Sequence, residues 1–326
     1  LMITFAFPAF NEAENLKRFP KEVMPVFDGL GGLYEILIVD DGSTDATEEV
    51  LGQFRECNQI EIYKKENGGK YTALNFGLKK VTSELVGCLD ADSFVAPSAL
   101  QEIVAYFKNK NVMVVTPAIK VYEPKNIIEY LQRAEYSLSI FIRRVFSQIN
   151  ALFITPGPFS IFRKEIFDML GEYKEAYNTE DLEIALRIQS NHYKIENAHK
   201  AVVYTVVPQT IKTLFKQRLR WTYGFLKNIA DYKHIFFKKE HAHLGFLVLP
   251  FAVISLFGAI FFMGMLIYFI IGRFIAKIIE IQILGTRALF ISFDWFYVDT
   301  NALIFLVYTL IAVTFVIIVI GKKLGG

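Results

Sequence analysis

The stretch YEILIVDDGSTD, residues 34–45, determines the fold class of this chain. Tyr34 to Val39 is an apolar run rich in β-branched residues, which is typical of a strand buried in a parallel sheet. Asp40 to Asp45 then form a polar turn in which Ser, Thr or Asp can cap a helix that continues through Glu49. A strand that leads through a polar turn into a helix is the repeating unit of an α/β fold.

The same alternation extends in both directions from this stretch. Ile3 to Phe7 predicts a strand that ends at Pro8, with a helix beginning near Asn11. Further strands are predicted at 60–64, 85–89 and 112–116, and helices at 71–80 and 97–108. We therefore expect an α/β fold with a doubly wound sheet, which binds ligands at the carboxyl ends of its strands.

Composition divides the chain into a soluble part and a membrane part. The 326 residues are 53% hydrophobic, and the excess lies in two uncharged stretches, Gly245–Gly272 and Thr300–Gly321. Both exceed the roughly 20 residues that a helix needs to cross a bilayer, which disfavours the alternative of buried core helices. The segment 274–293 is apolar but contains Glu280 and Arg287, so we expect an interfacial or re-entrant helix there, with a third span as the alternative.

Charge and cysteine content indicate the cellular location. Residues 245–326 account for the whole net charge of +2, so the soluble part is balanced and we expect no nucleic-acid partner. Basic residues flank the two stretches on the outside, which places both flanks in the cytoplasm and predicts a multi-pass protein of the cell membrane: Lys227, Lys233, Lys238, Lys239, Lys322 and Lys323. The two cysteines, Cys57 and Cys88, fit a reduced compartment better than a disulfide framework.

Acidic residues follow two of the predicted strands. Asp40-Asp41 closes one strand and Asp90-Ala91-Asp92 closes another. Because alternate residues of an extended segment share a face, Asp90 and Asp92 can reach one divalent cation. Asn67 to Lys70 forms a third strand-end loop, with a lysine placed for phosphate. For each segment alone, the alternative is an ordinary polar turn or helix cap.

Two later segments supply a base and a cationic group. A carboxylate of Thr179-Glu180-Asp181 can accept a proton, although acidic residues there also complement the dipole of a helix over 182–188. The guanidinium groups of Gln217-Arg218-Leu219-Arg220-Trp221 can stabilise a leaving diphosphate, or can form the basic face of a membrane-proximal helix. Together, the five segments provide the charges needed to move a sugar from a nucleotide diphosphate to a hydroxyl group.

The ordered series resembles family 2 glycosyltransferases, and most of all their membrane-embedded branch with cellulose, chitin and hyaluronan synthases. The segments that carry the resemblance are Pro8-Ala9-Phe10-Asn11-Glu12, Asp40-Asp41-Gly42, Gly69-Lys70 with Asn75, Asp90-Ala91-Asp92, Thr179-Glu180-Asp181 and Gln217-Arg218-Leu219-Arg220-Trp221. The resemblance extends over about residues 3–228 and the predicted membrane region. The resemblance implies a GT-A fold and an inverting, metal-dependent transfer from a nucleotide sugar, usually a UDP-sugar.

The resemblance also implies roles for individual residues. Asp181, next to Glu180, is the general base. Asp92, together with Asp90, binds Mg²⁺ or Mn²⁺. The remaining implied contacts are with the nucleotide sugar: Asp40 and Asp41 at the uridine, Glu12 and Asp90 along the nucleotide, Lys70 at the diphosphate, and Gln217, Arg218, Arg220 and Trp221 on the diphosphate and acceptor side.

The sequence therefore predicts three regions. Residues 1–208 form the catalytic domain, which includes an amphipathic helix near 126–150 that either packs on the sheet or lies in the membrane interface. Residues 209–244 form an interface helix with the Gln217–Trp221 motif. Residues 245–326 form the membrane region, with spans at about 245–271 and 301–320.

The expected partners are a UDP-sugar, membrane lipids and a glycan or lipid-linked acceptor. Because two spans are too few to enclose a polymer channel, export of a polymer would require a homo-oligomer or a membrane partner. The leading hypothesis is a processive polysaccharide synthase. The alternatives are a transferase that places one sugar on a polyprenyl phosphate, and an inactive membrane sensor that binds nucleotide sugars.

Overall fold

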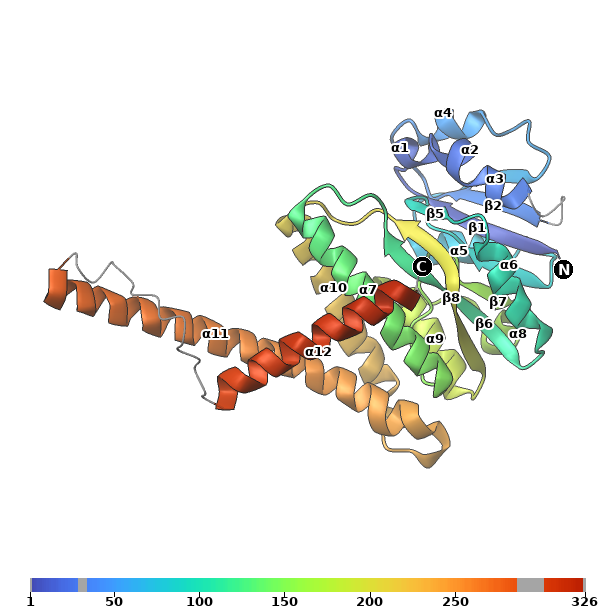
Figure 1. Cartoon of the computed structure of the whole chain (residues 1–326). Helices are drawn as coiled ribbons and strands as arrows, with labels where there is room; N and C mark the ends of the chain where they lie inside the picture. Colours follow the sequence, from blue (N-terminus) through green and yellow to red (C-terminus); the bar gives the residue numbers. More distant parts are fainter. Residues whose placement is uncertain (1, 29–33, 286–301, 325–326) are drawn as a thin grey trace.

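A mixed eight-stranded sheet forms the centre of the molecule (Figure 1). The computed structural model describes residues 2–28, 34–285 and 302–324. The strands are β1 (Ile3–Ala9), β2 (Tyr34–Asp40), β3 (Ile60–Lys64), β4 (Leu85–Cys88), β5 (Ser93–Val95), β6 (Val112–Val121), β7 (Ile161–Arg163) and β8 (Lys194–Thr205). Their spatial order is β3-β2-β1-β4-β7-β6-β8-β5.

The first half of the sheet is parallel, as the sequence predicted. Strands β3, β2, β1 and β4 pair in parallel, and Ala9 at the end of β1 lies opposite Asp40 at the end of β2. Pro8 does not end the first strand, contrary to the prediction, because it pairs with Val39 inside β1. The carboxyl ends of β1, β2 and β4 therefore meet at one edge, where ligands of open α/β sheets bind.

The second half of the sheet is mixed. Strand β7 is antiparallel to both β4 and β6, whereas β6 and β8 are parallel, and β5 is antiparallel to β8. In the sheet, the short β7 lies between β4 and the long β6–β8 pair. Because β7 is antiparallel to β4, the loop before β7 reaches the carboxyl end of β4.

Helices cover the sheet and then lead away from it. The helices of the first half are α1 (Ala13–Leu16), α2 (Phe19–Glu22), α3 (Met24–Asp28), α4 (Thr47–Gly52), α5 (Lys70–Leu78), α6 (Ala99–Val104), η1 (Ala105–Lys108) and α7 (Ile127–Gln148). The later ones are α8 (Glu165–Leu170), η2 (Ala176–Asn178), α9 (Glu180–Ser190), α10 (Ile211–Asp231), η3 (Lys233–Ile235), η4 (Lys239–His241), η5 (Leu244–Val248), α11 (Leu249–Leu284) and α12 (Ala302–Leu324).

Aromatic side chains fill the core between β1 and the neighbouring helices. The ring of Phe5 lies 4.7 Å from that of Phe27 and 5.3 Å from that of Phe159, measured between centroids. Gly87 on β4 makes room for Phe5, because a Cβ there would lie 2.4 Å from the phenyl ring. Cys57 and Cys88 are both free thiols, in agreement with the expectation from the sequence.

The C-terminal region that was predicted to lie in the membrane differs from the prediction in one boundary. Helix α11 continues from Leu249 to Leu284 without the break expected near residue 271, so residues 274–284 belong to the same helix as the first predicted span. Lys277 pairs with Glu280 at 3.0 Å along this helix, which satisfies both charges without ending it. The rest of the segment 274–293, from residue 286 on, lies outside the described residues.

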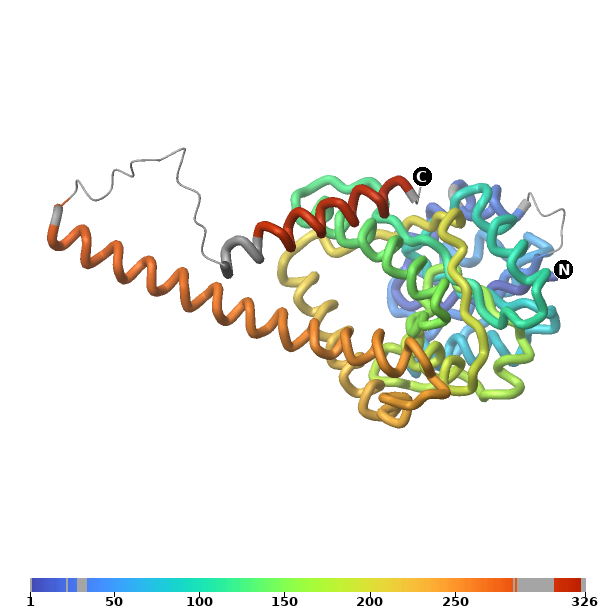
Figure 2. The backbone as a smooth tube through the Cα atoms, turned by 60° about the horizontal axis from the view of Figure 1, so that its bottom comes forward, coloured from blue at the N-terminus to red at the C-terminus, as the bar shows by residue number. Residues whose placement is uncertain are grey.

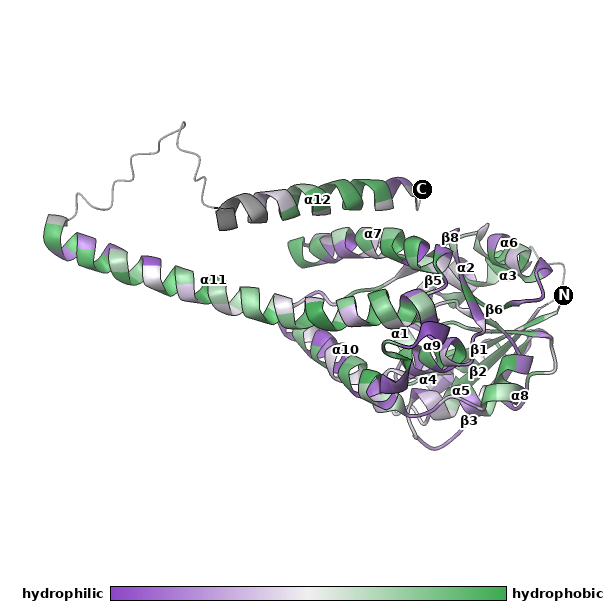
Figure 3. Ribbon diagram, turned by 90° about the horizontal axis from the view of Figure 1, so that it is seen from below, coloured by the Kyte–Doolittle hydropathy of each residue, from purple (hydrophilic) through white to green (hydrophobic). Residues whose placement is uncertain are grey.

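Among the described residues, the continuous helical segment Leu244–Ile283 is the one long and apolar enough to cross a membrane, by length and composition. It extends away from the sheet (Figures 1 and 2). The second expected span, at about 301–320, lies on α12, which returns to pack along α7, where Gly321 closely approaches Ser137. Both helices are strongly apolar (Figure 3).

The long helices α7 and α10 present apolar residues to the outside. On α7, Ile127 and Leu131 are exposed, whereas Glu129 and Gln132 on the opposite face are buried. On α10, Ile211, Phe215 and Leu219 form an exposed stripe at intervals of four residues. Ile127 and Leu131, near the start of α7, are therefore turned away from the sheet, whereas Ile140 further along the helix is buried.

Candidate functional site

The loops that follow β1 and β2 are joined by side-chain hydrogen bonds. Asn11, which has a φ of 57°, accepts a bond from the backbone N–H of Thr44 at 2.9 Å, and its own N–H donates to the Ser43 hydroxyl at 2.9 Å. The hydroxyl of Thr47 accepts a bond from the N–H of Glu12 at 2.9 Å. These bonds fix Glu12 beside the end of β2.

The carboxylate of Asp41 anchors the loop that leads to Lys70. It accepts bonds from the N–H groups of Gly68 at 3.1 Å and Gly69 at 2.9 Å, and it pairs with Lys65 at 2.5 Å. Gly69 has a φ of +89°, which favours glycine at this position. The residue predicted to contact uridine therefore holds a loop in this structure.

Asp40 keeps one oxygen free next to a cavity. Its Oδ1 accepts a bond from the N–H of Ser43 at 2.9 Å, but Oδ2 is buried and has no hydrogen-bond partner in the described part of the chain. The side chain lines a cavity of about 400 Å³ between α4 and β3, together with Arg55, Tyr63 and Lys64. Because a buried oxygen without a partner is costly, Asp40 is suited to accept a hydrogen bond from a ligand.

Lys70 lies between two of the predicted site carboxylates. Its ammonium group is 2.7 Å from Asp90 at the end of β4 and 3.5 Å from Glu180 at the start of α9. Burial opposes the charge, but the two carboxylates outweigh it and raise the pKa of Lys70 well above its ordinary value. The chain bends closely over this group at Gly157, where a Cβ would lie 2.8 Å from both Asp90 and Lys70.

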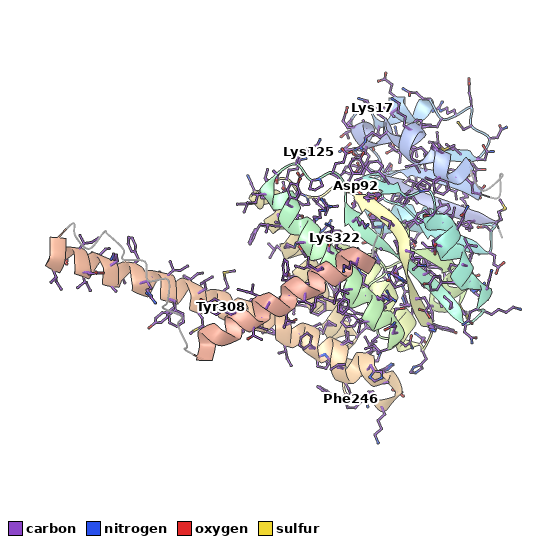
Figure 4. All side chains as sticks on the ribbon, in the orientation of Figure 1. Lys17, Asp92, Lys125, Phe246, Tyr308 and Lys322 are labelled. Carbon is purple, nitrogen blue, oxygen red and sulfur yellow. The ribbon has the colours of Figure 1, made fainter. Side chains whose placement is uncertain are left out.

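Asp90 and Asp92 lie on a turn, whereas the sequence predicted an extended segment. The N–H of Ser93 donates to the carbonyl of Asp90 at 3.0 Å, and the Ser93 hydroxyl donates to Asp92 at 2.9 Å. Burial and the charge of Asp90 raise the pKa of Asp92 to about 6, against the opposing effects of Ser93 and Lys70. The turn therefore places two carboxylates at the carboxyl end of β4, and Figure 4 labels Asp92.

Asp181 is the second residue of α9 and is half-buried. Burial and the neighbouring Glu180 raise its pKa to about 6, although Lys70 and the N–H of Leu182 favour the ionised form. The hydroxyl of Thr155 donates to the Asp181 carbonyl at 2.8 Å. A space of about 10 Å³ adjoins this group and Lys70, which is room for about one water molecule.

Two residues of α7 belong to this environment and were not predicted as site residues. Burial raises the pKa of Tyr136, with opposing effects from Arg218 and Arg143 and a smaller supporting effect from Asp92. Burial also lowers the pKa of Arg143, although the negative charge of Asp181 opposes this. The polar face of α7 therefore connects the β4 turn, Asp181 and the α10 motif. For Arg143, the signal that the sequence offered was a charged residue inside an amphipathic helix.

The Gln217–Trp221 motif on α10 makes few contacts with the rest of the site. Arg218 pairs with Glu135 of α7 at 2.7 Å and lies 4.5 Å from the ring of Trp221. The Oε1 atom of Gln217 is buried and unpartnered within the described ranges. Arg220 is exposed, and no hydrogen bond or ion pair from it is found to any described residue.

The residues present can bind a divalent cation whose coordination is completed by a ligand. No group of three or more His, Cys, Asp or Glu side chains in the described ranges is arranged to hold a metal by itself. Mg²⁺ commonly takes one or two protein carboxylates and completes its octahedron with phosphate oxygens and water. Asp90 and Asp92 provide such a pair. Burial, and after it the charge of Asp90, raise the pKa of Asp92, and a bound cation would favour its ionised form.

This mixed α/β sheet, with acidic loops at the carboxyl ends of its strands, defines a GT-A glycosyltransferase fold. Residues 4–171 match the model of Glycosyl transferase family 2, and the chain belongs to this family. The fold and the family expected from the sequence are thus confirmed.

Curated relatives and solved structures agree with this assignment. Poly-beta-1,6-N-acetyl-D-glucosamine synthases of Staphylococcus epidermidis and of Staphylococcus aureus strain COL are each 31% identical over 225 residues, covering 68% of this chain and 54% of theirs. The chain thus spans about half the length of these relatives. A mannosyltransferase from Pyrobaculum calidifontis, solved in complex with GDP-Man and Mn²⁺, has a TM-score of 0.56 at 20% identity, covering 88% of this chain and 84% of that one.

Proposed function

We propose that this protein is an inverting, metal-dependent glycosyltransferase that moves a sugar from a UDP-sugar to a growing glycan at the membrane. The observation that carries the proposal is the convergence of Lys70, Asp90 and Glu180 from the start of α5, the end of β4 and the start of α9, with Asp181 beside them. Cations and carboxylates in this arrangement fit a diphosphate, a divalent cation and a hydroxyl group that must lose its proton.

Asp181 acts as the general base in this proposal. It accepts the proton of the acceptor hydroxyl while that oxygen forms a bond to the anomeric carbon, and the bond from this carbon to the diphosphate breaks on the opposite face. A raised pKa of about 6 is favourable for a base that works near neutral pH. Direct displacement of this kind inverts the configuration of the sugar.

The donor occupies the carboxyl edge of the sheet. Asp40, Asp41 and Glu12 bind the nucleoside, and Lys70 leaves its carboxylate partners to bind the diphosphate. Asp90 and Asp92 would hold Mg²⁺ or Mn²⁺, which when bound would supply positive charge against the leaving group. The mannosyltransferase of similar fold was solved in complex with GDP-Man and Mn²⁺. Gln217, Arg218, Arg220 and Trp221 enclose the diphosphate and the acceptor sugar.

The exposed apolar residues support a location at a bilayer. The outward faces of α7 and α10, with Ile127, Leu131, Ile211, Phe215 and Leu219, suit the membrane interface, and α11 suits a span. Lys322, next to α7, brings the end of α12 back to the catalytic domain, which supports a hairpin with both flanks in the cytoplasm (Figure 4).

The relatives favour chain extension over a single transfer. Both named relatives are synthases of a β-1,6-linked N-acetylglucosamine polymer, so a polysaccharide is the product that we propose. Processive synthesis follows if the product stays bound between transfers. A product of one sugar on a polyprenyl phosphate would instead make this chain a lipid-linked transferase.

The test is nucleoside diphosphate release by the purified chain in lipid nanodiscs, over a panel of UDP- and GDP-sugars with Mg²⁺ or Mn²⁺. We expect release with one UDP-sugar that requires the metal and disappears in Asp181→Asn. Release that continues unchanged in this variant would refute the assignment of the base. Glycan length, measured by mass spectrometry, then separates a polymer from a single transfer.

A further inference from the structure

The C-terminal half of α10 is attached to the segment that carries the proposed base. Asn228 is 1% exposed, and its Nδ2 donates to the Thr179 hydroxyl at 2.9 Å, to the Gly224 carbonyl at 2.9 Å and to the Ala176 carbonyl at 3.4 Å. Thr179 directly precedes Glu180 and Asp181. Asn228 therefore contacts the N-cap of α9 from a different helix.

The backbone at this contact depends on such support. Ala176, Tyr177 and Asn178 have φ values of 44°, 58° and 59°, a left-handed conformation that non-glycine residues rarely adopt in succession. The Thr179 hydroxyl donates to the Ala176 carbonyl at 2.8 Å, and Asn228 donates to both of these groups. The bonds from Asn228 thus stabilise the turn that aims Thr179 to Asp181.

The fit between the two helices is also steric. A Cβ on Gly224 would lie 2.3 Å from the Thr179 Oγ1 and 2.4 Å from its Cγ2, so that only glycine allows this approach. A second bond lies one turn further along α10, where the Tyr232 hydroxyl donates to Glu183 of α9 at 2.5 Å. Two separate contacts therefore fasten α10 to the first two turns of α9.

The face of α10 that carries Gly224 and Asn228 continues toward the Gln217–Trp221 motif. Arg220, Gly224 and Asn228 follow one another at intervals of four residues, which places them on one face of α10. In the first half of α10, Ile211, Phe215 and Leu219 are exposed, whereas in the second half Gly224, Asn228 and Ile229 are buried. The helix is therefore anchored beside the base by its second half and carries the Gln217–Trp221 motif before this anchor.

We infer that Asn228 is a positioning residue that holds Asp181 in its productive place and links it to the Gln217–Trp221 motif on α10. Gly224 allows the close approach of the two helices that this contact needs. This inference rests on the proposed function and adds residues that act through Thr179, without contact to the substrate.

The test compares Asn228→Ala, Thr179→Val, the double variant and Gly224→Ala in nanodiscs. We expect each to lower kcat by between about 10-fold and about 100-fold, as for misplacement of a reacting group, while the Kd of the donor changes less than about twofold. The double variant should lose less than the product of the two single effects, because the two side chains share one hydrogen bond. Thr179→Ser keeps the hydroxyl and should retain nearly full kcat.

Hydrogen exchange supplies a readout that does not require turnover. Asn228→Ala should speed amide exchange in residues 172–181, with residues 112–121 of β6 unchanged. Asn191→Ala is the matched control, since this asparagine donates to the Arg187 carbonyl at 2.8 Å at the far end of α9 and should leave both segments and kcat unchanged. Unchanged exchange at 172–181, or equal loss of kcat and donor affinity, would overturn the inference. If the unaltered chain releases no nucleoside diphosphate, the proposed function fails. The exchange result then still decides whether Asn228 stabilises residues 172–181.

Discussion

The raised pKa of Asp181 makes a specific prediction for the pH dependence of the reaction. Only the ionised carboxylate can accept the proton of the acceptor hydroxyl, so kcat/KM should be present above pH 6 and lost as the pH falls through about 6. With a pKa of about 6, the ionised fraction falls from about 90% at pH 7 to about 10% at pH 5. We therefore expect about a tenfold loss of kcat/KM over this interval.

The loss of kcat/KM at low pH forms the acidic limb of the pH profile. Substitution of Glu180 offers a way to show that this limb comes from Asp181. Its negative charge is the second cause of the raised pKa of Asp181, after burial. Removing it in Glu180→Gln should move the limb to lower pH, whereas Lys70→Met should move it to higher pH, because Lys70 favours the ionised form. The two variants thus shift the same limb in opposite directions.

The assay is nucleoside diphosphate release between pH 5 and pH 9, at several metal concentrations. Asp92 also has a pKa of about 6, but a cation bound there competes with the proton, so a limb that comes from Asp92 shifts with metal concentration. The limb that comes from Asp181 stays in place. A limb below pH 5 at every metal concentration, or one unmoved in Glu180→Gln, would refute this account of the base.

Three further predictions concern stability, metal and leaving group. Folding raises the pKa of Asp181 from 3.8 to about 6, so the ionised carboxylate costs up to about 3 kcal/mol of stability above pH 6, and this cost disappears when the group is protonated at lower pH. Asp181→Asn should therefore raise the thermal midpoint at pH 7.5 and not at pH 4, and an equal rise at both would argue against this cost. In Asp92→Asn, calorimetry should find that donor binding no longer depends on Mg²⁺ or Mn²⁺, and a metal dependence equal to that of the unaltered chain would place the cation elsewhere. Arg220→Ala should lower kcat by on the order of 100-fold, about 3 kcal/mol, if this guanidinium contacts the departing diphosphate; a change of less than about threefold would exclude that contact.

Sequence patterns predicted the parallel half of the sheet because its strands are short, apolar and bounded by polar turns. The carboxyl ends of β1, β2 and β4 then bring Glu12, Asp40 and Asp90 to one edge without any knowledge of tertiary contacts. The mixed half was beyond such reasoning, since β7 has three residues and its partners lie far away in the sequence.

The neighbours of the site depend on which face of each helix turns inward. Periodicity identified the apolar face of α7, but a protein interior and a membrane surface produce the same pattern. The structure turns Ile127 and Leu131 outward, so that Tyr136 and Arg143 face the site instead. The pairing of Lys70 with Asp90 and Glu180 joins residues more than a hundred positions apart at its extremes, which no local pattern encodes.

The most direct test of the central claim is to separate binding from turnover in Asp181→Asn. Calorimetric titration of the nanodisc protein with the preferred UDP-sugar and metal should give the same Kd, within about twofold, as the unaltered chain, while nucleoside diphosphate release falls to background. This result would establish a nucleotide-sugar site with Asp181 as its base. Full turnover in the variant, or loss of donor binding together with turnover, would contradict that role.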